Sequence, residues 1–240
     1  MKILAIECSA KPASVALSED GKIICEFYSN VGLTHSETLM PMVDATLKTT
    51  GWTLKDIDGF CIAAGPGSFT GVRIGMSALK GMAFGLSKPV VGVSTLKAMA
   101  YNCVSHEGLI VSCMDARCGQ CYCGIYYSDG EKISEIIDGM ALSMEELCGK
   151  IAEETARLDK KAVVVGDGAE LFMKKHGSQF GGSVILSHPN CRFQTARGVA
   201  AVAYPEFLCK NTKSASDILP IYLRLPQAER ELKKRMEAQK

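Results

Sequence analysis

The residues with the clearest chemical potential form a glycine-rich turn between an apolar segment and a helical segment. The turn spans residues 65–75 and has the sequence GPGSFTGVRIG. Gly65 and Gly67 allow positive φ angles and close backbone approach, while Ser68 or Thr70 can cap the helix that follows. Unpaired N–H groups at such a helix N-terminus can bind a phosphate, or the turn can simply connect a strand to a helix. The motif therefore predicts an α/β crossover and leaves a phosphate site open.

Cysteines form a second candidate cluster. Four of the eleven cysteines lie close together in sequence, at Cys113, Cys118, Cys121 and Cys123. The first three have the C-x4-C-x2-C spacing of a plant-type iron–sulfur run. The segment also has the pattern of a β-hairpin in which Cys121 and Cys123 share one strand face. A metal role, a redox role and a purely structural role all stay open for these thiols.

Three adjacent polar residues, His35, Ser36 and Glu37, could be drawn as a hydrolase triad. Consecutive side chains on one helical turn do not normally align as base, nucleophile and orienting acid. Thr34 and Glu37 have the spacing of a capping box, which gives Glu37 a structural role. We therefore expect no hydrolytic site here.

The apolar periodicity around these residues predicts two halves with a similar order of elements. The first half is expected to contain strands at 2–7, 13–18 and 22–28, a helix at 35–50, a strand at 60–64, a helix at 70–86 and a strand at 90–93. The second half is expected to contain strands at 109–115, 120–127 and 132–138, a helix at 143–157, strands at 162–165 and 183–187, and a helix at 195–209. The pattern predicts a duplicated α/β fold with lobes at 1–103 and 104–225 and a charged tail at 226–240. Pro41 is expected to kink or break the first helix.

Length and charge narrow the classes of function. The chain has 240 residues, is 47% hydrophobic and carries a formal net charge of +1. Such a chain can bury a large core, and neither its charge nor a basic–aromatic run favours direct binding of nucleic acid. The first apolar run meets Glu7 at once, and no later run approaches the length of a membrane span. We expect a cytoplasmic protein without a membrane segment.

The second predicted helix carries two stripes that could contact a partner. The stripe of large residues contains Val72, Met76, Leu79 and Leu86, and the stripe of small residues contains Gly71, Gly75, Ala78 and Gly85. Each glycine costs about 1 kcal/mol in a helix interior, so several of them indicate tight packing against a sheet, a helix or another subunit. Packing within the chain is the simpler interpretation. Met76, Met82 and Phe84 favour an adhesive surface as the alternative.

Motifs along nearly the whole chain resemble the TsaB family, also called YeaZ. They are ILAIECS at 3–9, SVAL at 14–17, HSE at 35–37, the turn at 65–75, GVSTL at 92–96, DAR at 115–117 and PIYLR at 220–224. The resemblance implies a two-lobed, actin-like ATPase fold of the ASKHA superfamily, built from a duplicated RNase H-like unit. It also implies a role in the synthesis of threonylcarbamoyladenosine (t6A) at position 37 of transfer RNA, as a non-catalytic subunit. The implied partners are the catalytic subunit TsaD and the ATPase TsaE, with a homodimer when the chain is alone and transfer RNA reached only through the complex.

The resemblance also implies that a metal site of TsaD-like sequences is absent. Its His-x-x-x-His pair falls on Thr95 and Met99 in this chain. A threonine hydroxyl and a thioether are poor ligands for iron or zinc. We therefore expect no metal here.

The phosphate-binding hairpins of actin-like ATPases are altered as well. The resemblance places them at Glu7 and at 115–118, where Arg117 stands in place of a glycine that would let backbone amides surround a phosphate. The turn at 166–168 interrupts the Gly-Gly pair that packs under adenosine. Ser9 and Arg117 remain as phosphate-binding candidates. We expect no required cofactor for this chain and ATP only in the assembled complex, with a small-molecule kinase or ATPase as the alternative function.

The stripes and the resemblance together predict a docking face on the helices at 35–50 and 70–86. The predicted interface residues are His35, Leu39, Met40, Val43, Ser68, Phe69, Gly71, Val72, Arg73, Gly75, Met76, Leu79 and Met82.

Overall fold

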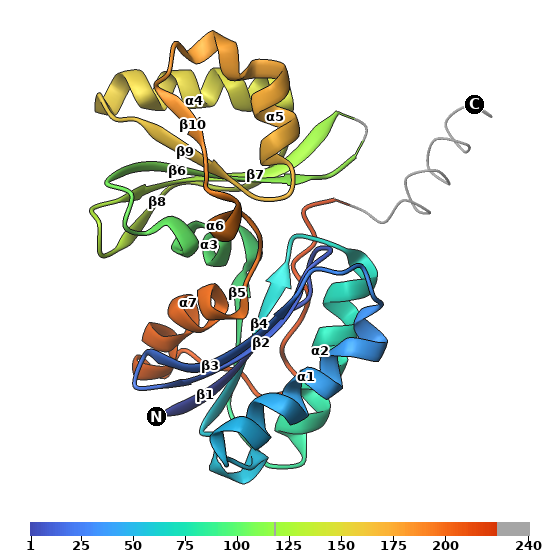
Figure 1. Ribbon diagram of the computed structural model, residues 1–240. Helices are drawn as coiled ribbons and strands as arrows, with labels where there is room; N and C mark the ends of the chain where they lie inside the picture. Colours follow the sequence, from blue (N-terminus) through green and yellow to red (C-terminus); the bar gives the residue numbers. More distant parts are fainter. Residues whose placement is uncertain (118, 225–240) are drawn as a thin grey trace, which may run out of the picture.

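The computed structural model describes residues 1–117 and 119–224, which form two lobes joined at the middle of the molecule (Figure 1). Cys118 and the tail at 226–240 lie outside the described residues. Each lobe contains one five-stranded sheet. In the described part of the chain, we find no helix with the length and apolar character needed to cross a membrane.

The first sheet has the strand order β3-β2-β1-β4-β5. Its strands are β1 (Lys2–Glu7), β2 (Ala13–Glu19), β3 (Lys22–Ser29), β4 (Gly59–Gly65) and β5 (Val90–Ser94). The central strand β1 is antiparallel to β2 and parallel to β4. Both β1 and β4 are buried along almost their whole length because helices cover both faces of the sheet, as expected for strands at a parallel pairing.

The second sheet repeats this order, which confirms the predicted duplication. Its strands are β6 (Gly108–Asp115), β7 (Gln120–Ser128), β8 (Ile133–Ser143), β9 (Ala162–Val165) and β10 (Val184–Leu186), arranged as β10-β9-β6-β7-β8. Each lobe therefore starts with a three-stranded antiparallel meander and adds two parallel strands on the other side of its first strand. Every strand expected from the sequence is present, with shifts of a few residues at the ends.

The helices cover the sheets in layers. They are α1 (His35–Thr50), α2 (Phe69–Phe84), α3 (Thr95–Ala100), α4 (Met144–Leu158), α5 (Ala169–His176), α6 (Pro189–Arg192) and α7 (Ala196–Leu208). Helices α1 and α2 pack on one face of the first sheet, and α7 packs on the other (Figure 1). Helices α4 and α5 cover the outer face of the second sheet. The short helices α3, α5 and α6 were not expected from periodicity, because each is too short for an apolar repeat to be visible.

The last helix returns to the first lobe, which differs from the predicted boundaries. Helix α7 lies against β1, β2 and β4, although the boundary at residue 103 places it in the second lobe. Its apolar residues Val199, Ala203 and Phe207 fill the face of the first sheet opposite α1 and α2. Further on, the Ile221 N–H donates to the Ala64 carbonyl at 2.7 Å. The first lobe therefore combines both ends of the described chain.

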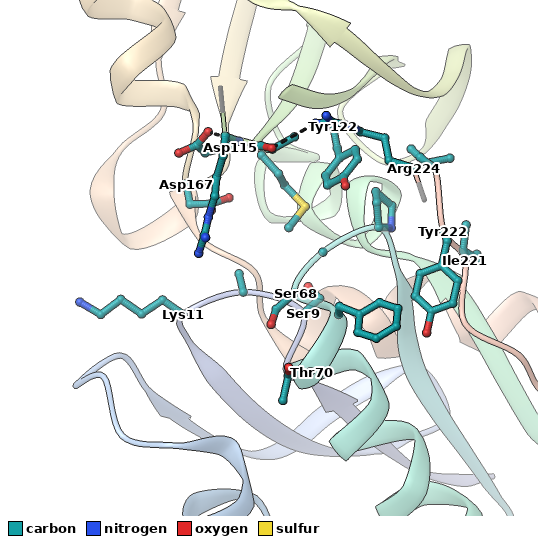
Figure 2. Close-up of a pocket in the computed structure, with 18 residues that line it drawn as sticks. Ser9, Lys11, Ser68, Thr70, Asp115, Tyr122, Asp167, Ile221, Tyr222 and Arg224 are labelled. Atoms are coloured by element: carbon teal, nitrogen blue, oxygen red, sulfur yellow. Dashed lines mark hydrogen bonds between the residues drawn. The ribbon is translucent and has the colours of Figure 1, made fainter. Parts of the chain in front are cut away.

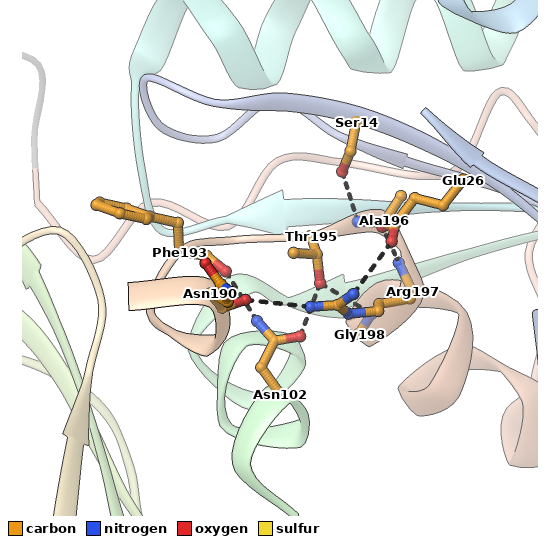
Figure 3. Close-up of polar contacts among 9 residues, drawn as sticks. All are labelled: Ser14, Glu26, Asn102, Asn190, Phe193, Thr195, Ala196, Arg197 and Gly198. Carbon is orange, nitrogen blue, oxygen red and sulfur yellow. Dashed lines mark hydrogen bonds and ion pairs between the residues drawn. The ribbon is translucent and has the colours of Figure 1, made fainter. Parts of the chain in front are cut away.

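Polar contacts hold the start of α7 where the chain crosses between lobes (Figure 3). The Ala196 N–H donates to Ser14 Oγ at 2.6 Å, which joins α7 to β2. Thr195 Oγ1 donates to Asn102 Oδ1 at 2.7 Å, and Asn102 Nδ2 donates to the Phe193 carbonyl at 2.8 Å. These bonds satisfy backbone groups that would otherwise be buried without a partner.

Two features predicted for α1 do not form: a break at Pro41 and a capping box at its start. The helix continues through Pro41 without a break, because Pro41 is exposed and water can satisfy the one carbonyl that loses its partner. The capping box does not form either. Thr34 Oγ1 donates to Glu37 Oε2 at 2.6 Å instead of accepting the Glu37 N–H. In α2, by contrast, Ser68 caps the helix by accepting the Gly71 N–H at 3.2 Å.

Candidate functional site

A cleft of about 700 Å³ lies between the two lobes (Figure 2). Four chain segments line it, at 9–11, 66–70, 114–117 and 221–224, together with Tyr122 and Asp167. Two of these segments follow β1 and β6, the corresponding first strands of the two sheets. The fold therefore brings the two hairpins together at the cleft, and both Ser9 and Arg117 line it.

The first hairpin contains a buried carboxyl group behind the cleft. Glu7 ends β1 and is fully buried, and its Oε1 accepts the Ser9 N–H at 2.5 Å. Its Oε2 has no hydrogen-bond partner. Burial raises the pKa of Glu7 to about 7, and the nearby Asp167 carboxylate adds to this effect. Ser9 is also fully buried, and its Oγ has no partner although the residue lines the cleft.

The glycines of the 65–75 turn are required for close approach of other backbone segments. Gly65 has φ +121°, and a Cβ there would overlap the Ile221 carbonyl oxygen. A Cβ on Gly67 would overlap the Ser9 carbonyl oxygen, which accepts the Ser68 N–H at 2.6 Å. These contacts give the turn a structural role. The start of α2 still faces the cleft, so its first N–H groups are available to an anion there.

The second hairpin places charged side chains in the cleft. Arg117 adopts φ +63°, and its N–H donates to Asp115 Oδ1 at 2.8 Å. Arg224 Nη1 donates to the Ala116 carbonyl at 3.1 Å. Asp167 lies in the turn at 166–168. Its burial raises the pKa of its carboxyl group, and the nearby Asp115 carboxylate raises this pKa further.

The cleft therefore carries both signs of charge. Lys11, Arg117 and Arg224 supply cations, and Asp115 and Asp167 supply carboxylates. Sequence reasoning named only Ser9 and Arg117 as ligand candidates. It missed Lys11 and Arg224 because these residues are distant in sequence and have no local motif. An anionic ligand could be held by the cations, the Ser9 hydroxyl and the α2 N-terminus, but side chains occupy the place of a glycine-rich phosphate hairpin.

The two positions at which the resemblance implies a metal pair in TsaD-like sequences are enclosed. Thr95 and Met99 lie on α3 and are fully buried. The Met99 thioether side chain packs in an apolar cluster between the lobes, and Thr95 Oγ1 has no hydrogen-bond partner. Among residues 1–117 and 119–224, no group of three or more His, Cys, Asp or Glu side chains is arranged to hold a metal ion.

The hydrolase interpretation of 35–37 is not supported by the geometry. His35 Nε2 lies 2.8 Å from the Ala10 carbonyl oxygen, a contact that requires the proton on Nε2. Ser36 Oγ donates to Thr34 Oγ1 at 3.3 Å, while Glu37 accepts from the same threonine. Each of the three side chains bonds to a residue outside the trio, and these contacts form no proton relay. His35, one of the predicted interface residues, instead connects α1 to the first hairpin.

Most of the predicted interface residues are buried inside the chain, so they cannot themselves present a docking surface. These residues are Leu39, Val43, Gly71, Val72, Gly75, Met76, Leu79 and Met82. A Cβ on Gly71 would overlap the Cys8 carbonyl oxygen, and a Cβ on Gly75 would overlap the Cys8 thiol and lie 2.9 Å from Ile62 Cδ1. The small stripe of α2 therefore packs against the first hairpin and the sheet. This corrects the expectation that Gly71, Gly75 and Met76 face a partner.

The remaining predicted residues do reach the surface. Met40, Ser68 and Arg73 are exposed, and Phe69 is half-buried. The Arg73 guanidinium lies 3.7 Å from the centre of the Phe69 ring, and its Nε donates to the Tyr222 hydroxyl at 2.9 Å. This stacking orders a long cationic side chain at the start of α2.

Sequence reasoning named Phe84 beside Met76 and Met82 but did not separate the exposed side of α2 from its buried sides. At the C-terminal end of the helix, Phe84 is 74% exposed. It continues an exposed stripe that also contains Thr70, Arg73, Ser77 and Gly81. The three- and four-residue spacing of this stripe was visible in the sequence, but the large apolar stripe was the stronger signal. We call Met40, Ser68, Phe69, Arg73 and Phe84 the α1–α2 surface.

Two sheets of the same strand order, with a cleft between their first hairpins, define an actin-like ATPase fold. The activator of 2-hydroxyisocaproyl-CoA dehydratase from Clostridium difficile with bound ADPNP shares this fold, with a TM-score of 0.51, 11% identity, and coverage of 92% of this chain and 100% of that chain. The family model described as TsaD, tRNA N6-adenosine threonylcarbamoyltransferase, matches residues 29–229.

More similar relatives narrow the family. The tRNA threonylcarbamoyladenosine biosynthesis protein TsaB of Escherichia coli is 32% identical, over 93% of this chain and 95% of the relative. The structure of YeaZ from Pseudomonas aeruginosa has a TM-score of 0.74 and 25% identity, and the match covers 92% of this chain and 99% of that chain. The chain belongs to the TsaB family, also called YeaZ, within the wider group that the TsaD model describes.

Proposed function

We propose that this chain is a non-catalytic subunit of the cytoplasmic machinery that makes t6A at position 37 of transfer RNA. The observation that carries the proposal is the full burial on α3 of Thr95 and Met99, the positions at which the family resemblance implies a metal pair in TsaD-like sequences. A chain of this fold without those ligands lacks the metal chemistry expected of the transferase itself. Relatives that match nearly the whole chain are named as t6A biosynthesis proteins, which supports the same pathway.

The proposed partner is a TsaD-type transferase, bound through the α1–α2 surface. Met40 and Phe84 supply exposed apolar area there, 46% and 74% exposed respectively. Arg73 supplies a pre-ordered cation stacked on Phe69. Apolar anchors beside an ordered arginine are typical of the residues that dominate binding energy at protein interfaces. In the absence of the transferase, a second copy of this chain would occupy the same surface.

The remaining partners follow from this arrangement. The complex, rather than this chain alone, would recruit TsaE and bind transfer RNA, because the net charge of +1 provides no basic surface for RNA. ATP would enter only in the assembled complex. The chain itself would then need no cofactor.

The docking proposal predicts that Arg73→Glu and Phe84→Glu each weaken binding to the transferase at least about tenfold, since each removes one anchor of the interface. Lys175→Glu and Leu208→Glu serve as matched controls, because both residues are exposed but lie outside the α1–α2 surface. Affinity is measured by titration calorimetry with purified TsaD from the same organism. Sedimentation of each variant alone measures self-association on the same surface.

Unchanged affinity in both Arg73→Glu and Phe84→Glu, with normal circular dichroism, would place the partner elsewhere. Reconstitution with TsaD and TsaE then tests the function itself. Omission of this chain should abolish t6A formation on transfer RNA, and a transferase fully active without it would contradict the proposed role.

The open cleft keeps a second function under consideration, that of a small-molecule kinase or ATPase. Ser9, Lys11 and Arg117 line one cavity and could contact phosphate groups. Because Arg117 blocks the glycine-type hairpin, we expect calorimetry of the isolated chain with ATP and magnesium to show no binding in the micromolar range. Micromolar binding that is lost in Lys11→Ala would instead favour the kinase or ATPase function.

A further inference from the structure

Three cysteines cluster on one face of the second sheet, away from the cleft and the α1–α2 surface. Cys113 lies on β6, and Cys121 and Cys123 lie on β7. All three are buried as free thiols in the core beneath α4 and α5. The proposed function uses none of them.

The strand register places two of these thiols directly opposite each other. Cys113 pairs with Cys123 across the antiparallel β6–β7 ladder. Paired residues in such a ladder alternate between hydrogen-bonded and non-hydrogen-bonded sites. The Ala116 N–H donates to the Gln120 carbonyl at 3.0 Å, so the pair 116/120 is hydrogen-bonded. The pair 113/123 lies three positions further along the ladder and is therefore a non-hydrogen-bonded pair.

The neighbouring strand supports this assignment. The Cys113 carbonyl accepts the Gly168 N–H at 3.1 Å, so it points away from β7. Residues in a non-hydrogen-bonded pair have Cα atoms about 4.5 Å apart. Disulfides form when Cα atoms are about 4.4–6.8 Å apart. The backbone therefore already holds Cys113 and Cys123 at a distance that a disulfide can span.

Cys121 is a competing thiol with less suitable backbone geometry. It belongs to the same buried core cluster as Cys113 and Cys123. It lies two residues along β7 from the position opposite Cys113. The rise of two residues along the strand and the spacing between paired residues together place the Cα atoms of Cys113 and Cys121 roughly 8 Å apart. That separation exceeds the limit of about 7 Å for a disulfide without backbone movement.

We propose that Cys113 and Cys123 are a reversible oxidation site that takes hydrogen peroxide as its oxidant. One thiolate attacks a peroxide oxygen, which yields a sulfenic acid and, after protonation, one water. The partner thiol then attacks the sulfenic sulfur and releases a second water as the S–S bond forms. The two thiols lose two electrons and two protons, and the peroxide is reduced to two waters.

The bridge would fix the base of the hairpin that carries Asp115 and Arg117 into the cleft. Both residues lie within four positions of Cys113 and line the cleft. The oxidation state of the pair would thereby set how freely one wall of the cleft can move.

The test treats the full chain with hydrogen peroxide, blocks remaining thiols with N-ethylmaleimide after unfolding, and maps cross-linked peptides by tandem mass spectrometry. We expect a Cys113–Cys123 link with the loss of two hydrogens, reversed by dithiothreitol. Cys121→Ala should keep this link, whereas Cys113→Ala and Cys123→Ala should abolish it. Mapping in the unmodified chain gives the answer even if a variant does not fold.

Three results would overturn the proposal. Cys113 and Cys123 could both stay fully alkylated at peroxide concentrations that oxidise the exposed Cys209. Cys113 could be linked to Cys121 in place of Cys123, which would contradict the register argument. Finally, stoichiometric metal bound to the purified chain and lost in Cys113→Ala would identify these thiols as ligands.

Discussion

Gly71→Ala is expected to lower the free energy of unfolding by about 2 kcal/mol, the usual cost of overpacking a filled site. The added methyl group would overlap the Cys8 carbonyl oxygen, and His35 Cδ2 lies only 2.9 Å from its position. A backbone carbonyl cannot rotate away as a side chain can, so α2 or the first hairpin must shift. Chemical denaturation measures this loss directly, and the melting temperature should fall by roughly 4–8 °C for a chain of this size.

Gly81→Ala on the same helix is the matched control. Gly81 is exposed, and apart from its two chain neighbours and the backbone of its own helix, no atom lies within 4 Å of the position of an added Cβ. Alanine is favoured over glycine in a helix interior by about 1 kcal/mol, so this variant should be more stable than the natural chain. Equal stabilisation by both substitutions would show that Gly71 does not face its own hairpin, and the surface role first predicted for the small stripe would have to be reconsidered.

Glu7→Gln is expected to change how stability depends on pH. The pKa of Glu7 is about 7 in the folded chain, against an ordinary value of 4.5. Between pH 4.5 and about pH 7, Glu7 keeps its proton in the folded state but releases it in the unfolded state. The contribution of Glu7 to the free energy of unfolding is therefore complete below pH 4.5 and is lost as the pH rises to about 7. The loss amounts to about 3 kcal/mol at 1.36 kcal/mol for each pKa unit.

Glutamine cannot ionise, so the variant should not show this loss. Denaturant titrations of both proteins from pH 5 to pH 8 should give a free-energy difference that moves in favour of Glu7→Gln by up to about 3 kcal/mol. The two proteins are compared by the slope of the free energy of unfolding against pH. The glutamine amide also leaves one donor group without a partner, and this lowers the free energy of unfolding of the variant by a constant amount at every pH. Parallel curves would mean that Glu7 is already ionised in the folded protein and that a cation or water reaches Oε2.

The order of elements could be obtained from local patterns. Apolar alternation and glycine turns identify β1 and β4, and the repeat of meander, helix and strand predicts the duplication. Helices α3, α5 and α6 were missed because six, eight and four residues contain too few turns for a periodic signal. The assignment of α7 to the second lobe failed for another reason. The sequence of α7 itself does not determine which of the two sheets the helix will pack against.

The docking residues illustrate the same limit. The sequence shows that α2 has one large and one small stripe, but Gly71, Gly75 and the large residues Val72, Met76 and Leu79 pack inside the chain. The side left at the surface, with Arg73 and Phe84, is determined by where β1, β4 and α1 lie. Only after those elements are in place can exposed and buried stripes be distinguished.

The sequence by itself predicted the strand and helix order and carried the family resemblance, because both depend on residue types at fixed spacings. The tertiary structure alone decided that Ser9 and Arg117 share a cleft, that Gly71 seats α2 on the first hairpin, and that Cys113 faces Cys123. These outcomes depend on contacts between segments far apart in the chain, and such contacts are selected by the packing of the whole fold and not by any local pattern.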